Sequence, residues 1–291
     1  MEYPKISIVT PSFNQGQFLE ETILSVITQG YPNLEYIIID GGSTDHSVEI
    51  IRKYEQHLSY WVSEPDKGMY YALQKGFEKS TGEIMGWLNS DDMLHPKALF
   101  SIAEILSIPG VKWMTGLPNV FDEMGRTVNV KDLGKRCRLR HVTDNVFIQQ
   151  DCTYWRRELW NMAGAYLDKE FKLAGDFELW DRFFKYEKLY TTNCLTGGFR
   201  LSQSGQLSQN VDAYFTEVEK VLKITLEDAS IMEKVKKLNK YKRFKKLLSR
   251  SRILNLGFLV TRIDRRINAL YDYPEEIVFD REKQNFVLRN N

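Results

Sequence analysis

Two adjacent carboxylates, Asp91 and Asp92, come directly after a short apolar run and are well suited to chemistry. The run Glu83–Leu88 has the length of a buried strand, and it ends in Asn89-Ser90-Asp91-Asp92. In open α/β folds, ligands bind at the carboxyl ends of the strands. Paired carboxylates there suit a divalent cation, Mn²⁺ or Mg²⁺, because such ions prefer oxygen ligands and often bridge to substrate phosphates. The alternative is a solvated turn, since Asn, Ser and Asp all favour turns.

Two further apolar runs also end in polar residues. Thr10-Pro11-Ser12-Phe13-Asn14 follows Ile6–Val9, and Asp40-Gly41-Gly42 follows Tyr36–Ile39. Neither segment has the GxGxxG pattern of a dinucleotide site or the Gly-rich Lys-Ser/Thr pattern of a phosphate loop. We therefore expect a nucleotide at this edge to be held through acidic groups and a cation rather than by a glycine cradle.

The elements that position these residues alternate between strand and helix over the first hundred residues. Helices are predicted over 18–28, 48–54 and 70–79, between the three apolar runs and a short strand near 60–62. This alternation predicts right-handed βαβ units and an α/β fold with a mostly parallel central sheet flanked by helices. A further helix is predicted over Asp176–Tyr186, and the chain beyond residue 210 is predicted to be helical throughout.

The composition is that of a globular protein, with 43% hydrophobic and 27% charged residues. Three widely spaced cysteines without a CxxC pattern argue against a disulfide framework or a zinc site. No apolar run has the length of a membrane span. We expect a cytoplasmic protein.

Positive charge gathers in the last part of the chain. Residues 1–210 hold 22 Lys/Arg against 27 Asp/Glu, whereas residues 211–291 hold 18 against 12. Ten of these basic residues lie between Lys234 and Arg252, with apolar residues at 3–4 spacing among them. Such a helix suits an anionic membrane surface, which would make the protein peripheral at the inner face of the membrane. Packing on the rest of the chain with a solvated basic face is the alternative, and no nucleic acid is expected as a partner.

Five segments of the chain carry a resemblance to a known family. They are Ser7–Asn14, Tyr36–Asp45, Ser63–Gly68, Gly82–Asp92 and Gly175–Trp180. In their order and spacing they resemble the family 2 glycosyltransferases, which have the GT-A fold. The resemblance extends over roughly residues 5–200 and implies an inverting, metal-dependent transferase that uses a nucleotide-diphosphate sugar, a UDP-sugar. It also implies a saccharide or lipid-linked acceptor in surface polysaccharide or glycan biosynthesis.

The resemblance assigns roles to single residues of this chain. Thr10, Pro11 and Asn14 would lie along the nucleotide. Asp40 would accept hydrogen bonds from the base, with Asp45 as the cap of the next helix, and Asp66 and Lys67 would lie near the base and the diphosphate.

The acidic segment departs from the family's Asp-x-Asp motif. Asn89 takes the first acidic position, where its amide can still donate to a ribose hydroxyl, so the cation must depend on Asp91 and Asp92. Which of these two is the direct ligand stays open.

The catalytic base implied by the resemblance is Asp176, which removes the proton of the acceptor hydroxyl. Glu178, Asp181 and Asp151 are the alternatives. Ser202 stands where the family often has a histidine, so a ligand from that position would be lacking.

The predicted organisation is a catalytic domain over 1–210, with a nucleotide-binding half at 1–110 and an acceptor-side half at 111–210. A basic helical extension over 211–291 follows. Two other functions stay open: a non-catalytic sugar-nucleotide-binding or scaffold protein, and a sugar nucleotidyltransferase. The latter would need a Gly-rich basic signature after the first strand, which Pro11–Gln15 does not provide.

Overall fold

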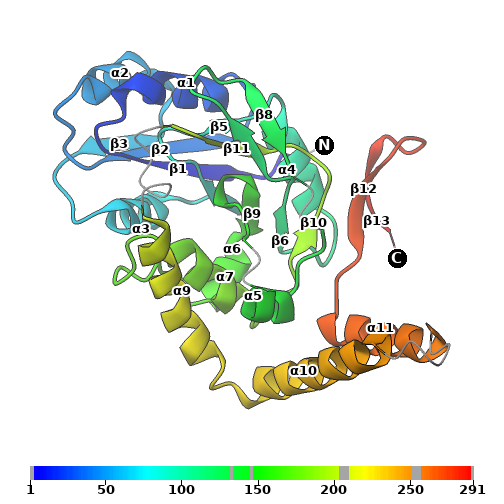
Figure 1. The fold of residues 1–291 in the computed structure, drawn as a ribbon. Helices are drawn as coiled ribbons and strands as arrows, with labels where there is room; N and C mark the ends of the chain where they lie inside the picture. Colours follow the sequence, from blue (N-terminus) through cyan, green and yellow to red (C-terminus); the bar gives the residue numbers. More distant parts are fainter. Residues whose placement is uncertain (1–2, 132–133, 145–146, 203–209, 251–256, 290–291) are drawn as a thin grey trace.

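A seven-stranded sheet in the order β10-β6-β9-β4-β1-β2-β3 forms the centre of the molecule (Figure 1). The structure is a computed structural model that describes residues 3–131, 134–144, 147–202, 210–250 and 257–289. The strands of this sheet are β1 (Ile6–Ser12), β2 (Leu34–Asp40), β3 (Tyr60–Ser63), β4 (Ile84–Trp87), β6 (Trp113–Thr115), β9 (Thr153–Arg156) and β10 (Tyr190–Thr191).

The first four strands in sequence, β1 to β4, run parallel, and β10 runs parallel to β6. Only β9 among the strands of this sheet runs antiparallel to its neighbours β4 and β6. The predicted α/β fold with a mostly parallel sheet is therefore confirmed. Because β1, β2 and β4 are parallel neighbours, their carboxyl ends meet at one edge, as the sequence predicts.

Helices cover both faces of the sheet. Apolar side chains along each strand alternate between two cores, so that Ile8 of β1 joins one and Val9 the other. The first core lies against α1 and α4, and the second against α3, α6 and α7. The helices are α1 (Gly16–Ile27), α2 (Ser47–Lys53), α3 (Met69–Lys79), α4 (Ala98–Leu106), α5 (Arg138–Asp144), α6 (Arg157–Met162) and α7 (Gly175–Phe183).

A second, four-stranded sheet in the order β5-β11-β7-β8 continues from the acidic segment. Its strands are β5 (Met93–Leu94), β7 (Asn119–Phe121), β8 (Thr127–Val130) and β11 (Gly197–Arg200). Gly197 allows β11 to approach the short 3₁₀ helix η2 (Gln150–Cys152), since a Cβ there would lie 2.0 Å from the carbonyl oxygen of Asp151. The sheet therefore places β11 against η2, and η2 also contacts β4.

The helices after residue 210 pack on the side of the molecule that carries α5 and α7. Helices α9 (Val211–Thr225), α10 (Ala229–Arg250) and α11 (Gly257–Tyr271) follow one another, with α10 and α11 packed side by side (Figure 1). In the described part of the chain, no helix has the length and apolar character needed to cross a membrane.

The chain ends in a β-hairpin of β12 (Glu276–Asp280) and β13 (Asn285–Arg289), which the prediction of helix throughout 211–291 misses. Ile277 and Phe286 of this hairpin belong to the core on the α4 face, and the amide of Phe286 donates to Glu104 Oε1 of α4 at 2.8 Å. Each strand is a short run of three apolar residues between polar ones, Ile277–Phe279 in β12 and Phe286–Leu288 in β13, which has the length of a strand rather than of a helix.

Candidate active site

The loops after β1 and β2 are joined to one another at the predicted edge. The amide of Asn14 donates to Ser43 Oγ at 2.8 Å, and its Oδ1 accepts from the amide of Thr44 at 2.9 Å. Pro11 is buried in β1, and the Thr10 hydroxyl lies inside the fold, 3.1 Å from that of Tyr36. Of the three residues predicted to lie along the nucleotide, Asn14 alone has an exposed side chain.

The Asp40 carboxylate is buried and organises the turn that follows it. It accepts hydrogen bonds from the amides of Gly42 and Ser43 and from the hydroxyls of Ser43 and Ser63, at 2.6–3.1 Å. Gly42 is needed in this turn because its φ is +82°. The sequence interpretation gives Asp40 to the nucleotide base, whereas in the structure its carboxylate holds the loop on which a nucleotide would lie.

Asp45 joins the starts of two helices, as expected for a cap. Its Oδ1 accepts from the amide of Ser47 in α2 at 3.0 Å, and its Oδ2 accepts from the amide of Gly16 in α1 at 2.9 Å. The prediction that Asp45 caps the helix after the turn therefore agrees with these contacts.

Asp66 and Lys67 lie at the same edge on an exposed loop. Asp66 Oδ1 accepts from the amide of Gly68 at 2.7 Å, and its carboxylate lies over Gly41, where an added Cβ would come 3.0 Å from Oδ2. The Lys67 ammonium lies 6.0 Å from the centre of the Tyr71 ring. The loop after β3 therefore brings both predicted residues beside the Asp40 turn.

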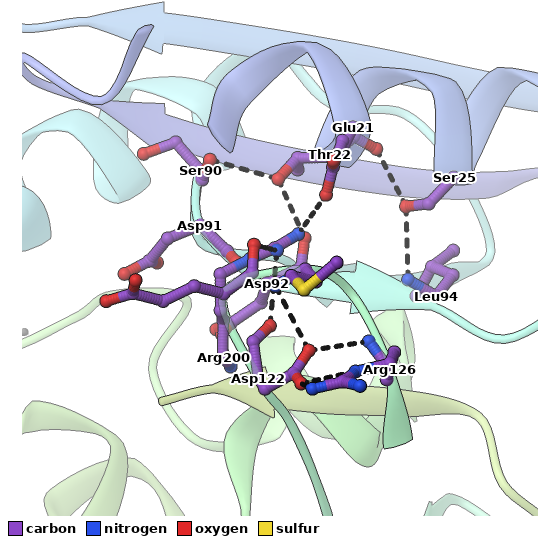
Figure 2. A network of polar contacts seen from close by, with 12 residues as sticks. Glu21, Thr22, Ser25, Ser90, Asp91, Asp92, Leu94, Asp122, Arg126 and Arg200 are labelled. Carbon is purple, nitrogen blue, oxygen red and sulfur yellow. Dashed lines mark hydrogen bonds and ion pairs between the residues drawn. The ribbon is translucent and has the colours of Figure 1, made fainter. Parts of the chain in front are cut away.

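The acidic segment at the end of β4 is tied down by its own residues and by α1. Asp92 accepts from the Asn89 amide group at Oδ2 (3.1 Å), and Thr22 Oγ1 lies within hydrogen-bonding distance of the carbonyls of Ser90 and Asp92. These contacts leave the side chain of Asp91 directed away from the others (Figure 2).

Arg200, at the end of β11, is a site residue that the sequence reasoning misses. Its side chain is fully buried: Nε donates to the carbonyl of Asp91 at 2.7 Å and Nη2 to Glu21 Oε2 at 2.7 Å (Figure 2). Its backbone amide donates to Asp92 Oδ1 at 2.8 Å. The segment Gly197–Ser202 draws attention in the sequence through the missing histidine at Ser202, but its arginine is the residue that holds the acidic segment.

Three carboxyl groups of this region, those of the half-buried Asp91 and of the buried Asp92 and Asp151, repel one another. Burial raises the pKa of Asp91, that of Asp92 well above its usual range, and that of Asp151 to about 7. The charges of Asp91 and Asp151 add to the rise for Asp92, whereas Arg200 lowers the pKa of Asp91. Such mutual repulsion favours a cation close by.

The donor set fits a divalent cation that is shared with a diphosphate. Asn89 Oδ1 is buried without a hydrogen-bond partner in the described residues, and the Asp91 carboxylate is directed away from the network. The described residues contain no group of three His, Cys, Asp or Glu side chains arranged to enclose a metal by themselves. Mg²⁺-type sites commonly use one or two carboxylates plus substrate phosphates, which is the arrangement these residues allow.

Asp176 lies in the first turn of α7, 9% exposed, and its Oδ1 accepts from the amide of Phe177 at 2.8 Å. Burial raises the pKa of Asp176 to about 7. Tyr70 connects Asp176 to the loop after β3, because Tyr70 lies in the first turn of α3, just after residues 64–68, and its hydroxyl accepts from the amides of Gly175 and Asp176.

The alternative bases on α7 are engaged in ion pairs. Glu178 pairs with Arg182 of the next turn at 2.7 Å, and Asp181 is buried 3.6 Å from Lys185. Asp176 is the carboxyl group of this helix whose surroundings suit proton transfer near neutral pH.

A comparison with protein families gives a match over residues 7–159, more than half of the chain, to the model described as glycosyl transferase family 2. The chain belongs to glycosyl transferase family 2.

Curated glycosyltransferases match about a third of the chain. An uncharacterised glycosyltransferase of Mycobacterium tuberculosis is 38% identical over 109 residues, 37% of this chain and 42% of the relative. A putative teichuronic acid biosynthesis glycosyltransferase of Bacillus subtilis is 36% identical over 94 residues, 31% of this chain and 36% of the relative. The chain thus spans about two fifths of the length of these curated relatives.

Solved structures of low sequence identity share the fold over most of the chain. S. aureus TarS 1-349 in complex with UDP-GlcNAc has a TM-score of 0.65 at 17% identity, covering 91% of this chain and 79% of TarS. A mannosyltransferase from Pyrobaculum calidifontis in complex with GDP-Man and Mn²⁺ has a TM-score of 0.56 at 16% identity, with 92% and 70% covered. The predicted GT-A-like fold with C-terminal helices is thereby confirmed.

Proposed function

We propose that this member of glycosyl transferase family 2 is a metal-dependent, inverting glycosyltransferase that moves a sugar from a nucleotide-diphosphate sugar to a saccharide acceptor. The observation that carries the proposal is the presence of two separate sets of acids. Asp91 and Asp92 follow β4, where they suit a cation that is shared with a diphosphate. Asp176 stands apart in the first turn of α7, where burial raises its pKa to about 7.

Donor binding is assigned to the loops after β1, β2, β3 and β4. Asn14, Asp66 and Lys67 are exposed on these loops and are the residues that we assign to contact with the nucleotide, while the buried Thr10, Pro11 and Asp40 shape the loops. Asn89 is assigned to the ribose, to which its amide group can donate.

Asp91 is the proposed direct ligand of Mn²⁺ or Mg²⁺, because the carboxylate of Asp92 already accepts from Asn89 and from the Arg200 amide. When bound, the cation neutralises the charge that the diphosphate gains as it leaves. Asp92 and Arg200 fix the backbone that carries Asp91.

Asp176 is the proposed base of a single displacement. The acceptor oxygen forms its bond to the anomeric carbon as the bond from that carbon to the diphosphate oxygen breaks, and the proton of the acceptor passes to the carboxylate of Asp176. A base with a pKa close to the working pH combines a sufficient deprotonated fraction with useful basicity. One oxygen of Asp176 is held by Phe177 N–H, which fixes the orientation of the other.

The comparisons support particular substrates. The TarS structure was solved with UDP-GlcNAc, and the P. calidifontis enzyme with GDP-Man and Mn²⁺, which supports a nucleotide-diphosphate sugar, a UDP-sugar, with Mn²⁺ as cofactor. The name of the B. subtilis relative refers to teichuronic acid biosynthesis. It supports a saccharide or lipid-linked acceptor in surface polysaccharide assembly.

Release of nucleotide from a panel of sugar nucleotides tests this function. Purified protein is incubated with UDP-GlcNAc, UDP-glucose, UDP-galactose and GDP-mannose, with Mn²⁺, Mg²⁺ or EDTA. We expect slow release from at least one UDP-sugar, through water acting as acceptor, that depends on the cation and is lost in Asp176→Asn. Mn²⁺-dependent binding of UDP-sugars without release of UDP would instead assign a non-catalytic binding role. Full activity in EDTA would contradict the proposed metal dependence.

We propose that helices α10 (Ala229–Arg250) and α11 (Gly257–Tyr271), which we call the arm, hold the protein at an anionic membrane surface on the cytoplasmic side. α10 confirms the predicted helix up to residue 250; Arg252 lies outside the described residues. Phe244, Leu247 and Phe258, which we call the apolar cluster of the arm, are 51%, 66% and 69% exposed. Exposed basic residues accompany them, and apolar groups among Lys and Arg are the pattern of a helix that lies in a membrane interface. The exposed basic residues are Lys234, Lys236, Lys237, Lys240, Lys242, Arg243, Lys246, Arg262, Arg265 and Arg266.

A further inference from the structure

The backbone just before the proposed base is held by a carboxylate from a distant part of the chain. Glu217, on α9, accepts hydrogen bonds from the amides of Lys172 (3.0 and 3.2 Å to its two oxygens), Leu173 (2.9 Å) and Ala174 (2.8 Å). A single side chain thus satisfies the N–H groups of the three residues that immediately precede α7, which begins at Gly175. Negative charge is favourable close to the N-terminal end of a helix.

The remaining amides of this segment are also satisfied, by α3 and by the base itself. Those of Gly175 and Asp176 donate to the Tyr70 hydroxyl at 2.9 and 3.3 Å, and that of Phe177 donates to Asp176 Oδ1. The Tyr70 hydroxyl in turn donates to the carbonyl of Leu173 at 3.2 Å. Six consecutive N–H groups, 172–177, therefore have acceptors, and this fixes the main chain on both sides of Asp176.

Apolar packing keeps α9 in place beside this segment. Val218 and Val221 of α9 form a small buried cluster with Ala174 and Phe177. Glu217 stands next to Val218 on the helix, so the packing delivers the carboxylate to the three amides. The contacts join residues that are 43–45 positions apart in sequence.

We propose that Glu217 is a positioning residue for the reaction, which fixes the Asp176 carboxylate for proton transfer through the backbone of residues 172–174. The proposal rests on the proposed function, since it takes Asp176 as the base. It makes α9 part of the catalytic machinery, although this helix lies beyond residues 7–159 that match the family model.

The charge of Glu217 gives this role a signature that a merely structural contact lacks. Burial is the largest cause of the raised pKa of Asp176, and the negative charge of Glu217 adds to it. The other titratable groups that face Asp176 are Tyr70 from α3 and Tyr214 from α9, both of which keep their protons because burial raises their pKa further. Glu217 is thus the neighbouring group whose replacement by a neutral residue lowers the pKa of Asp176.

The experiment measures UDP release with Mn²⁺ and the UDP-sugar that gives the highest rate, as a function of pH. Glu217→Gln removes the charge and places an amide group against the backbone amides, and Glu217→Asp keeps the charge but withdraws it by one methylene group. Glu219→Gln, an exposed position on the same helix, is the matched control. Thermal unfolding and Mn²⁺-dependent UDP binding establish that each variant is folded.

We expect kcat to fall roughly 10- to 100-fold in both Glu217 variants with KM for the donor unchanged, since a small misplacement of a catalytic group costs up to about 10²-fold. The acid limb of the pH profile should move to lower pH in Glu217→Gln and stay in place in Glu217→Asp, and Glu219→Gln should match the wild type. If Glu217→Gln does not fold, the kcat of Glu217→Asp decides.

Wild-type kcat in a folded Glu217 variant overturns the proposal, as does a fall in kcat that is matched by a rise in KM with an unchanged pH profile in Glu217→Gln. Asp176→Asn separates this failure from failure of the proposed function. If Asp176→Asn is inactive while the Glu217 variants are fully active, the base stands and the positioning role falls. If Asp176→Asn is fully active, the assignment of the base itself is wrong.

Discussion

The substitutions Asp91→Ala and Asp92→Ala, made one at a time, should have different effects although the two residues are adjacent. Asp92→Ala should lower the stability of the protein, and Asp91→Ala should remove Mn²⁺-dependent UDP binding. Asp92→Ala removes the acceptor of two buried donors, the amide of Arg200 at 2.8 Å and the Asn89 side-chain amide at 3.1 Å. A buried donor left without an acceptor costs about 1–3 kcal/mol, so the two together cost about 2–6 kcal/mol. Removing a carboxyl group whose pKa burial raises well above its usual range returns part of this cost. We expect a net loss of about 2–4 kcal/mol.

Asp91→Ala has no comparable cost. Apart from its own backbone amide, no described residue donates a hydrogen bond to the Asp91 carboxylate, and the charge of Asp91 adds to the raised pKa of Asp92 and of Asp151. Its removal relieves this repulsion, so the free energy of unfolding should stay the same or rise by up to about 1 kcal/mol. The same substitution should abolish the Mn²⁺-dependent part of UDP binding.

Chemical denaturation and thermal unfolding with and without Mn²⁺ and UDP measure both effects. A ligand present at one hundred times its Kd stabilises a protein by about 2.7 kcal/mol, so the wild type should show a clear upward shift of Tm. Asp91→Ala should lose that shift from an unchanged starting Tm. Asp92→Ala should start several degrees lower, because 1 kcal/mol corresponds to roughly 2–4 °C in a domain of this size. Equal destabilisation by both substitutions, or Mn²⁺-dependent UDP binding that survives in Asp91→Ala, would refute the division of roles.

Three further outcomes are expected. Asp176→Asn should keep UDP binding but lower transfer by about 10²-fold or more, whereas Glu178→Gln should stay active. Because the deprotonated carboxylate of Asp176 is the form that accepts the proton, wild-type activity should rise with pH through about 7. Arg200→Lys should destabilise the protein and weaken Mn²⁺-dependent UDP binding together, since lysine cannot reproduce the fork that reaches Asp91 and Glu21; wild-type Tm and binding would contradict this. Replacing the apolar cluster of the arm by serine should reduce co-sedimentation with anionic vesicles, most clearly at low salt, whereas the control Met124→Ser should not; equal binding of both would assign the arm to solvent.

Point variants of the arm are preferable to removal of the chain after residue 210. Residues 211–291 supply Glu217 to the base segment and Ile277 to the core of the sheet. A truncation would therefore remove parts of the site and of the core together with the basic surface, and loss of vesicle binding would have no single cause.

The sheet edge could be predicted from the sequence because its signals are local. Each of the strands β1, β2 and β4 is a short apolar run followed at once by turn-forming polar residues, and parallel pairing then brings their ends together. The positions of Asp66, Asp91 and Asp176 follow from the same kind of signal, a carboxylate at the boundary of an element. Local pattern therefore gives the list of candidate acids.

Which of these acids hold the structure together and which are free for a ligand could not be predicted, because this depends on partners far away in the chain. Arg200 reaches Glu21 across 179 positions and Asp92 across 108. The sequence position of Asp40 predicts a contact with the nucleotide base, yet its carboxylate accepts hydrogen bonds from two serine hydroxyls and two backbone amides. The hairpin of β12 and β13 was missed because it follows a basic helical stretch, and its short apolar runs, Ile277–Phe279 and Phe286–Leu288, pack on elements far away in the chain.

The structure changes the interpretation of Asn89, the first residue of the acidic segment. In the sequence, Asn89 removes a charge from the Asp-x-Asp pattern and leaves room for a protein that binds sugar nucleotides without reacting. In the structure, Asp151 of η2 is a further buried carboxyl group whose negative charge adds to the raised pKa of Asp92. The side-chain amide of Asn89 donates to Asp92 Oδ2, while the buried oxygen of Asn89 has no partner in the described residues. Asn89 therefore keeps an oxygen for a ligand and Asp151 adds negative charge to the region, so the missing first acid of the motif does not argue against the proposed catalysis.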